Sequence, residues 1–455
     1  MNPAKPHFKP SVGSVITRYR TTGDGSDPPA GETLDASARR LRIRRQVLYG
    51  WALLIIVSFA TGGVLHGLGV LRIDHLPPLH AHFRVLTVTL LPAAAFGAAA
   101  VLLLPGLLAR SGFGRALALG YGCALVWTVL LAVSGDGLAA PFTHKEEYLA
   151  VLPAVGSDPL GWLAGFTEHL PQYPTHVRGH PPLPVLVLWA LKAVGLPGAL
   201  WAAVLVVLVG CSATVAIAVT IRRLAGEDMA RRALPYLALA PASVWIATSM
   251  DAFFAGVGAW GVALLVLGGG RWGRPACGAA SGVLLGALPY LSYGLVPYLL
   301  LPAVVAVIVR PPRVVLMAVL AGAAAVSGAF AAAGFLWPAG VLATHAQWAA
   351  DPGAARPYLY FLIANLGVLA LVTGPATAAG LAGRMPATVR TVIAAALVAV
   401  LALDVSGVTR GEVERIWAPF ALWISVAGGF AGGRRWLVAQ VVTGLLLQGL
   451  VASPW

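Results

Sequence analysis

The sequence predicts an all-α polytopic membrane protein, and three observations predict it. The chain has 455 residues, of which 58% are hydrophobic and 11% are charged, whereas soluble globular proteins carry about 25% charged residues. Apolar stretches of about 20 residues, the length of a membrane-spanning helix, recur from residue 49 to the C-terminus. Pairs of arginines separate these stretches. The chain is therefore expected to cross the bilayer many times as helices.

The position of the positive charge indicates a membrane rather than a nucleic-acid partner. The formal net charge is +14, but many of the basic residues form short arginine pairs between apolar stretches. Such pairs mark the cytoplasmic side of membrane proteins. Placing them all in the cytoplasm puts the N-terminus inside and the C-terminus outside the cell membrane. No nucleic acid is expected as a partner; the lipid bilayer is.

The arginine pairs divide residues 49–455 into thirteen expected spans in a single transmembrane domain. Residues 1–48 are rich in Pro, Gly, Ser and Thr and end in a basic cluster at Arg39–Arg45, which predicts a disordered basic cytoplasmic tail. Pro289, Ser292 and Gly294 divide the range 275–309 into two spans. The expected spans are 49–71, 85–109, 116–136, 198–221, 232–250, 252–269, 275–291, 293–309, 314–337, 357–375, 387–404, 417–432 and 436–452.

The largest polar segment is the expected outer loop 137–197, which contains a short apolar segment at 182–196. Fifteen residues are few for a bilayer of about 30 Å, and arginine pairs on both sides require an even number of crossings. We therefore expect 182–196 to lie along the outer membrane surface as a juxtamembrane helix. With this topology most acidic and histidine side chains beyond the tail face the outside, where we expect the chemistry.

Adjacent carboxylates open this loop in Glu146-Glu147-Tyr148. Partial burial raises the pKa of a carboxylate toward the range useful for a general base, so Glu147 or Glu146 is a candidate catalytic base with Tyr148 in support. The alternative is a solvated helix N-terminus, where acidic residues favour the helix dipole.

His176, Arg178 and His180 precede Pro181-Pro182 at the start of the short apolar segment. A proline pair is tolerated at the first turn of a helix, and a helix N-terminus with basic side chains attracts phosphate. The alternative is a helix cap with solvated basic groups. These histidines could also hold a divalent metal together with Glu147 or His345, although their spacing does not by itself indicate a metal site.

Two further outer segments carry candidate residues. Asp251 is a lone acid at the end of an apolar stretch, in ATSMD, where a carboxylate is expected to act in function or to pair with Arg178, Arg356 or Arg415. In the loop GEVERIW, Arg415 could bind a phosphate and Glu412 could hold it in place. The alternative there is an interfacial charge cluster with no catalytic role.

A nucleotide cofactor is not expected. The three glycines at 268–270 are followed by Arg271 and not by Lys-Ser/Thr, so they predict a turn rather than a phosphate-binding loop.

The order of these motifs resembles a known family. A carboxylate-Tyr motif lies in an outer loop, and HPPLPVLVLWALKAVG follows it as a short helix. A span ending in Arg-Arg-Leu-x-Gly comes next, and then the acid of ATSMD. Across residues 137–270 this resembles the integral-membrane glycosyltransferases of the GT-C class, especially protein O-mannosyltransferases and lipid A aminoarabinose transferases.

The resemblance implies a GT-C-like fold and a function in sugar transfer on the outer membrane face. The donor would be a polyprenyl-phosphate-linked sugar rather than a nucleotide sugar, and the acceptor a glycan, lipid or protein. Glu147, with Glu146 as its rival, would be the base and Asp251 the second acid. Arg178 and His180, with His176 and Arg415, would bind the donor phosphate. Arg178, Arg415 or a divalent metal would stabilise the charge on the departing phosphate.

Two other classes of function remain. A lipid or solute transporter would carry ionisable groups at mid-membrane depth, internal repeats and broken helices. A scaffold subunit of a machine that builds the cell envelope would need none of these features.

Overall fold

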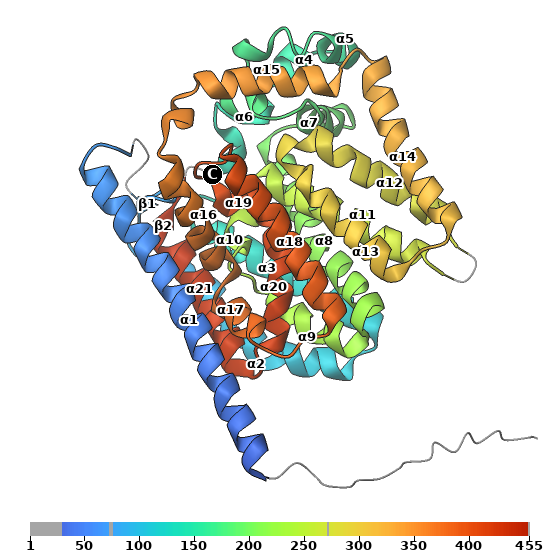
Figure 1. Ribbon diagram of the computed structural model, residues 1–455. Helices are drawn as coiled ribbons and strands as arrows, with labels where there is room; N and C mark the ends of the chain where they lie inside the picture. The colour runs from blue at the N-terminus through green and yellow to red at the C-terminus, as the bar shows by residue number, and fades with distance from the viewer. Residues whose placement is uncertain (1–29, 72–75, 271–272, 454–455) are drawn as a thin grey trace, which may run out of the picture. The chain divides into compact units, whose positions relative to one another are not determined.

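The computed structural model describes residues 30–71, 76–270 and 273–453, the side chains of residues 30–37 and 40 excepted (Figure 1). The chain divides into a unit that ends at Arg42 and a unit Ile43–Trp455, and the second holds the candidate site. Residues 1–29 of the expected disordered tail lie outside the described residues. From Ala30 onward the chain is helical, in α1 (Ala30–Gly67), so the helix begins inside the range expected to be disordered.

The described residues form an all-α structure, as predicted. A two-residue antiparallel pairing of β1 (His82–Phe83) with β2 (Val451–Ala452) accompanies the helices. The longer helices after α1 are α2 (Leu91–Arg110), α3 (Phe113–Ser134), α8 (Ala199–Ala225), α9 (Glu227–Ala238), α11 (Met250–Gly268), α12 (Pro275–Leu291), α13 (Leu300–Val309), α14 (Arg313–Ala332), α15 (Trp337–Ala350), α16 (Tyr358–Thr373), α18 (Ala387–Ser406) and α21 (Arg434–Leu450).

The prediction of thirteen crossings is wrong, because the described chain has seven helices that are long and apolar enough to span a membrane. A bent pair, α16 with α17 (Pro375–Leu381), would make an eighth span. The chain is therefore a helical integral membrane protein with seven or eight candidate spans. The seven are Leu41–Gly67, Val88–Arg110, Phe113–Ser134, Ala199–Ala225, Met250–Gly268, Arg313–Ala332 and Ala387–Ser406.

Prolines and short lengths account for the missing spans. The range 232–250 is divided because α9 ends at Ala238, shortly before Pro241, and α10 (Ser243–Ile246) has four residues. The range 293–309 consists of the 3-10 turns η5 (Tyr293–Leu295) and η6 (Pro297–Leu299) before the ten-residue α13. The range 417–432 is α20 (Ala418–Ser425) followed by η8 (Val426–Phe430). At 1.5 Å per residue the 17 residues of α12 or α21 reach about 26 Å, less than the bilayer core of about 30 Å.

The break between α16 and α17 is stabilised by a buried glutamine. Gly374 has a positive φ of 80° and Pro375 lacks an N–H group, so the helix cannot continue, and the two helices meet at 98°. Gln440 of α21 accepts from the Ala376 N–H at 3.1 Å and donates to the Thr373 carbonyl at 2.6 Å. The side chain thus satisfies backbone groups that an apolar surrounding would otherwise leave unpaired.

The long polar loop 137–197 consists of short helices, and its apolar end is the short helix expected from the sequence. These elements are η2 (Ala140–Thr143), η3 (Tyr148–Val151), α4 (Leu152–Val155), α5 (Pro159–Ala164), η4 (Leu170–Gln172), α6 (Thr175–Arg178) and α7 (Leu183–Ala193). With 11 residues, α7 is about 17 Å long and too short to cross a bilayer. Prolines at the starts of α4, α5 and α7 set these short helices apart.

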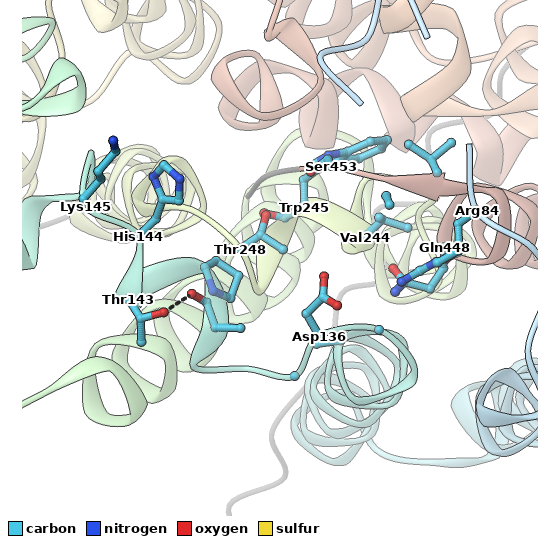
Figure 2. Close-up of a pocket in the computed structure, with 17 residues that line it drawn as sticks. Arg84, Asp136, Thr143, His144, Lys145, Val244, Trp245, Thr248, Gln448 and Ser453 are labelled. Carbon is cyan, nitrogen blue, oxygen red and sulfur yellow. Dashed lines mark hydrogen bonds between the residues drawn. The ribbon is translucent and has the colours of Figure 1, made fainter. Parts of the chain in front are cut away.

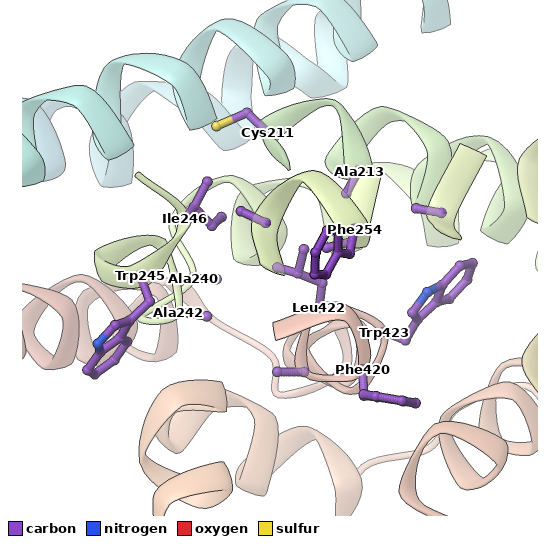
Figure 3. Close-up of a cluster of buried hydrophobic side chains, with 14 of the residues drawn as sticks. Cys211, Ala213, Ala240, Ala242, Trp245, Ile246, Phe254, Phe420, Leu422 and Trp423 are labelled. Carbon is purple, nitrogen blue, oxygen red and sulfur yellow. The ribbon is translucent and has the colours of Figure 1, made fainter. Parts of the chain in front are cut away.

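A core between α8, α11 and α20 fixes the ends of the helices that carry the candidate site. In Figure 3, Phe254 of α11 lies beside Leu422 of α20 within a cluster of fully buried side chains. Trp423 of α20 donates from its indole N–H to the Tyr298 hydroxyl at 2.8 Å. This packing fixes the first turn of α11, which bears Asp251, against the segment before α20, which bears Arg415.

Close packing of α12 on α14 depends on small residues (Figure 1). A Cβ atom added at Gly282 of α12 would lie 2.1 Å from the Val319 carbonyl oxygen of α14. At Gly328 of α14 an added Cβ would meet nothing within 4 Å. Alanine at Gly328 would change only the helix propensity, whereas alanine at Gly282 would also change the contact between the two helices.

We predict that Gly282→Ala lowers the free energy of unfolding by about 1–3 kcal/mol because the new methyl group overpacks the interface. Gly328→Ala is the matched control and is expected to be neutral or to stabilise by up to about 1 kcal/mol, since alanine favours a helix over glycine. Unfolding of the detergent-solubilised protein by sodium dodecyl sulfate measures both. Equal stability of the two variants would contradict the prediction.

Candidate functional site

A cavity of about 410 Å³ collects most of the predicted site residues. Its walls come from four segments of the chain, 175–180, 292–294, 341–356 and 403–416. Apolar atoms of Val341, Leu403 and Ile416 line it beside charged groups. The predicted site residues in the lining are His176, Arg178, His180, His345, Glu412 and Arg415.

Arg415 is the centre of a buried charge network at this wall. Its side chain is only 5% exposed, and its Nη1 donates to Asp251 Oδ2 at 3.1 Å while Nη2 donates to Glu412 Oε2 at 2.7 Å. Asp251, in the first turn of α11, is buried to the same degree and also accepts from the Ser249 hydroxyl at 3.1 Å. The sequence left open whether Asp251 pairs with Arg178, Arg356 or Arg415, and the structure pairs it with Arg415.

His176 connects this arginine to Glu147. Arg415 Nη2 lies 3.1 Å from His176 Nε2, and His176 Nδ1 lies 2.7 Å from Glu147 Oε1. A guanidinium has only donors, so Nε2 must accept, and the imidazole proton then sits on Nδ1 toward the carboxylate. Glu147, His176, Arg415 and Asp251 thus form one continuous chain of contacts. Glu147 and Asp251 lie behind the cavity lining and reach it through the other two.

The two adjacent glutamates face different partners. Glu146 is partly exposed, and its Oε2 accepts both the N–H of Thr175 at 2.9 Å and the hydroxyl of Thr175 at 2.8 Å. These hydrogen bonds lower the pKa of Glu146. Glu147 is 3% exposed, and its Oε2 has no hydrogen-bond partner among the described residues. The geometry therefore gives Glu146 a role in holding α6 and places Glu147 beside the charge network.

His180 and Tyr148 form the apolar side of this corner. The Tyr148 ring is buried, 5.7 Å from the His180 ring centroid and 6.2 Å from that of His176, and its burial raises the pKa of the phenol. Burial also lowers the pKa of His180 to about 4. His180 Nδ1 lies 2.8 Å from the His176 carbonyl oxygen, so the proton of the neutral ring is on Nδ1. His180 therefore presents Nε2 as an acceptor and carries no charge near neutral pH.

Opposite charges hold Glu412 ionised. Burial acts to raise its pKa, but the positive charges of Arg415 and, more weakly, Arg356 lower it below its usual value. The pKa of Arg415 is raised, since Glu412, Asp251 and Glu147 outweigh the effect of its burial. Arg356 Nη1 lies 4.0 Å from Glu412 Oε1. Both shifts favour the charged forms of Glu412 and Arg415.

The cavity has a cationic lining. Arg178, Arg356, Arg410 and Arg415 line it, against the carboxylates of Asp351 and Glu412. Arg178 makes a long 3.4 Å contact with the Thr175 hydroxyl, and no described carboxylate lies within 4 Å of its guanidinium. Such a wall attracts an anionic group of the size of a phosphate. His345 lines the cavity from α15, 5.6 Å from the Trp348 ring centroid.

No group of three or more His, Cys, Asp or Glu side chains suited to a metal occurs among the described residues.

A second cavity of about 490 Å³ lies on the other side of the same loop (Figure 2). Arg84 and Gln448 lie at one side of it, and His144 and Lys145 lie at the other. None of the ten predicted site residues lines this cavity. The first residues of the segment 140–147 therefore line the 490 Å³ cavity. Its last two, Glu146 and Glu147, contact residues that line the 410 Å³ cavity.

Sequence reasoning missed several residues of the site. Thr175, which holds Glu146, gave no sequence signal because it is uncharged, and Arg410 was missed beside the charged residues Glu412–Arg415. Arg410 stacks 5.5 Å from the Trp348 ring centroid and donates to the Arg356 carbonyl. Glu414, 1% exposed, lies next to Arg415 in the same short helix α19 (Val413–Ile416). The rarity of charged residues in the chain was the signal that could have found Arg410 and Glu414.

No protein-family model matches the chain, and no curated protein matches it significantly.

We predict that Arg415→Met lowers the free energy of unfolding by about 3–5 kcal/mol, since it leaves buried Asp251 without its counter-charge. Arg415→Met combined with Asp251→Asn should recover part of this loss. Denaturant unfolding in detergent measures the coupling between the two sites. Arg223→Met, at an exposed arginine, is the control and should stay within about 0.5 kcal/mol of wild type. A similarly small change in the free energy of unfolding for Arg415→Met would show that the buried network does not stabilise the protein as predicted.

The depressed pKa of His180 predicts a pH dependence of stability. Below about pH 6.5 the unfolded chain binds a proton at this ring, while the folded protein binds it only near pH 4. Falling pH therefore favours unfolding between these values. In His180→Asn the amide N–H replaces the donor Nδ1, and stability should fall less over this window than in wild type. The same substitution at exposed His345 is the control, and identical pH profiles for wild type and His180→Asn would refute the prediction.

Proposed function

We propose that this protein is a membrane glycosyltransferase of GT-C-like type, which moves a sugar from a polyprenyl-phosphate carrier to a hydroxyl acceptor. The observation that carries the proposal is the chain of contacts from Glu147 through His176 and Arg415 to Asp251, at the wall of a cavity lined by arginines. A proton acceptor and a phosphate-binding cation are the two groups that this transfer requires. In the proposal, Glu147 and Arg415, which are far apart in the sequence, supply these two groups at the wall of the same cavity.

In the proposal, the donor phosphate binds to Arg178 and Arg415. Arg178 faces the cavity with no described carboxylate in ion-pair distance, so its charge is available to a phosphate oxygen. Arg415 can turn Nη2 from His176 to the phosphate while Nη1 remains on Asp251. As the carbon–oxygen bond to the phosphate breaks, both guanidinium groups stabilise the charge that develops on the leaving oxygen.

Glu147 is the proposed final proton acceptor, and His176 is the proposed carrier. The acceptor oxygen bonds to the anomeric carbon while polyprenyl phosphate leaves with the bonding electrons, which inverts the configuration at that carbon. The hydroxyl proton goes to His176 Nε2, and the Nδ1 proton moves to Glu147 Oε1. This route explains why Glu147 can act without lining the cavity. Phosphate binding to Arg415 would free Nε2 at the moment the base is needed.

The remaining side chains of the cavity fit the sugar and the lipid tail. A neutral His180 cannot neutralise a phosphate, but its Nε2 can accept a hydrogen bond from a sugar hydroxyl. We therefore propose His180 as a sugar contact instead of a phosphate ligand. Val341, Leu403 and Ile416 are apolar surfaces for the first isoprene units. In the proposed orientation the N-terminus is cytoplasmic and the cavity opens to the outer side of the cell membrane.

A transporter remains the second candidate, and one observation favours it. The bend of 98° between α16 and α17 is a broken helix, and broken helices form the binding sites of many secondary transporters. A transporter would move a lipid-linked or soluble substrate without covalent change. The glycosyltransferase proposal differs from it by the formation of a new glycosidic bond.

We predict that Glu147→Gln reduces sugar transfer by about 10²–10⁴-fold, the range lost with a general base, while the protein still inserts and folds. The assay reconstitutes purified protein in liposomes with synthetic polyprenyl-phosphate hexoses and pentoses. Mass spectrometry then measures the released polyprenyl phosphate and the glycosylated product. The donor to test first is the lipid-linked sugar that accumulates in cells lacking the protein.

Glu146→Gln is the matched control, since it makes the same change one residue away, where the carboxylate holds Thr175. It should keep most of the activity. An active Glu147→Gln with an inactive Glu146→Gln would move the base by one residue. Wild-type activity in both variants would remove the loop from the chemistry, and transport of an unchanged substrate by all three proteins would favour the second candidate.

A further inference from the structure

A buried polar cluster joins α16 to the C-terminal end of α18. Asn365 of α16 is 0% exposed and Asp404 in the last turn of α18 is 1% exposed. The Asn365 side-chain amide donates to Asp404 Oδ1 and to the Thr409 backbone carbonyl, both at 2.9 Å. One amide group thus holds the helix end and the loop that follows it.

Three further oxygen atoms of the same residues are buried without a partner. Asn365 Oδ1, Asp404 Oδ2 and Thr409 Oγ1 accept no hydrogen bond from any described residue. All three belong to residues that the Asn365 amide already joins by hydrogen bonds. Buried oxygens in native proteins nearly always have a partner, because an unsatisfied polar group in an apolar surrounding is destabilising.

The carboxylate of Asp404 also lacks a positively charged partner among the described residues. Among the described residues, no Arg, Lys or His nitrogen lies within ion-pair distance of its carboxylate. Arg410 is near in sequence, but its guanidinium donates to the backbone carbonyls of Gly407, Ala354 and Arg356. Asp404 also lies at the C-terminal end of a 20-residue helix, where the helix dipole adds negative potential. Both effects favour a bound cation.

We propose that Asn365, Asp404 and Thr409 form a binding site for a sodium ion. A carboxylate, an amide carbonyl and a hydroxyl are hard oxygen ligands of the kind that alkali and alkaline-earth cations prefer. The set carries a single negative charge, which matches a monovalent ion better than Ca²⁺ or Mg²⁺, whose sites usually hold several carboxylates. The ion would satisfy all three oxygens and neutralise Asp404 together.

The proposed ion supports the wall of the candidate site without taking part in its chemistry. Leu403, Thr409 and Arg410 line the 410 Å³ cavity, and the loop from Gly407 leads directly to Glu412 and Arg415. A cation at Asp404 would therefore hold the start of this loop. The site does not depend on the proposed sugar transfer, so its test uses stability rather than activity.

The experiment compares thermal unfolding of the full-length protein in a non-ionic detergent, in sodium chloride and in choline chloride at equal ionic strength and pH. Sodium binding to the folded state should raise the midpoint of wild type by about 2 °C or more at saturation. Asp404→Asn keeps the side-chain shape but removes the charge, and it should abolish the sodium-dependent shift. Thr409→Val removes one ligand oxygen and should raise the sodium concentration needed for half of the shift.

Asp158→Asn, the same substitution at an exposed carboxylate that caps α5, is the matched control and should retain the wild-type shift. Equal midpoints of wild type in sodium and choline would overturn the proposal. So would a sodium-dependent shift that persists in Asp404→Asn. Stabilisation of wild type by falling pH alone, lost in Asp404→Asn, would mean that a proton occupies the site in place of sodium. If Asp404→Asn does not fold, Thr409→Val decides: an unchanged half-saturating concentration would count against the site.

Discussion

Neutralisation of buried carboxylates by Arg415 is the constraint on which the candidate site depends. Asp251 and Arg415 are 164 residues apart and both nearly inaccessible to solvent. A carboxylate transferred from water to such a place is strongly destabilising alone, and it is tolerated when a guanidinium pairs with it and further hydrogen bonds satisfy its other positions. Ser249 donates such a bond to Asp251, and Arg415 itself also donates to Glu412. The first turn of α11 and the short helix α19 must therefore fold together.

The apolar core prepares this pairing. Phe254 and Trp423, each fully buried, belong to helices that begin close to Asp251 and Arg415 respectively. Core packing is non-directional and fixes the distance between the helices, whereas the hydrogen bonds of Arg415 fix their rotation and register. The short helices of residues 140–178 then add Glu147 and His176 from a third segment. The candidate site therefore forms only where three segments meet, which are α11, α19 and the short helices of residues 140–178.

The sequence predicted the class of fold and missed the number of spans for a physical reason. Hydrophobicity and arginine pairs report where a segment is apolar and where it ends, and they located α8, α11, α14 and α18 within a few residues. They do not report whether an apolar segment stays helical across its whole length. Pro241 follows the end of a helix inside the expected span 232–250, and Pro297 begins a 3-10 turn inside the expected span 293–309. Buried polar partners can stabilise a break in a helix, as the hydrogen bonds of Gln440 at the bend after α16 demonstrate.

The candidate residues were easier to predict than their arrangement. Charged residues are few in this chain, and burying one requires a partner, so the acids of the loops stood out. Which glutamate faces the interior could not be read from Glu146-Glu147, because the direction of each depends on contacts with Thr175 and His176, some 29 residues on. Asp404 gave no signal, since it stands at the end of the expected span 387–404, where a polar residue is usually solvated; Asn365, in the middle of the expected span 357–375, was missed because it is uncharged.

The wall that bears Glu412 and Arg415 is held by polar contacts rather than by apolar packing. Arg356 donates to the Arg410 carbonyl at 2.8 Å, and Arg410 donates to the Arg356 carbonyl at 2.9 Å. Asn365 binds the same loop at Thr409 on one side, and Arg415 binds α11 at Asp251 on the other. Hydrogen bonds of this kind have fixed directions, so they can keep charged groups aimed into the cavity that is proposed to hold a lipid tail. Apolar packing alone would let the wall adapt to its contents, and the guanidinium of Arg415 would then lose the position that the proposed phosphate binding requires.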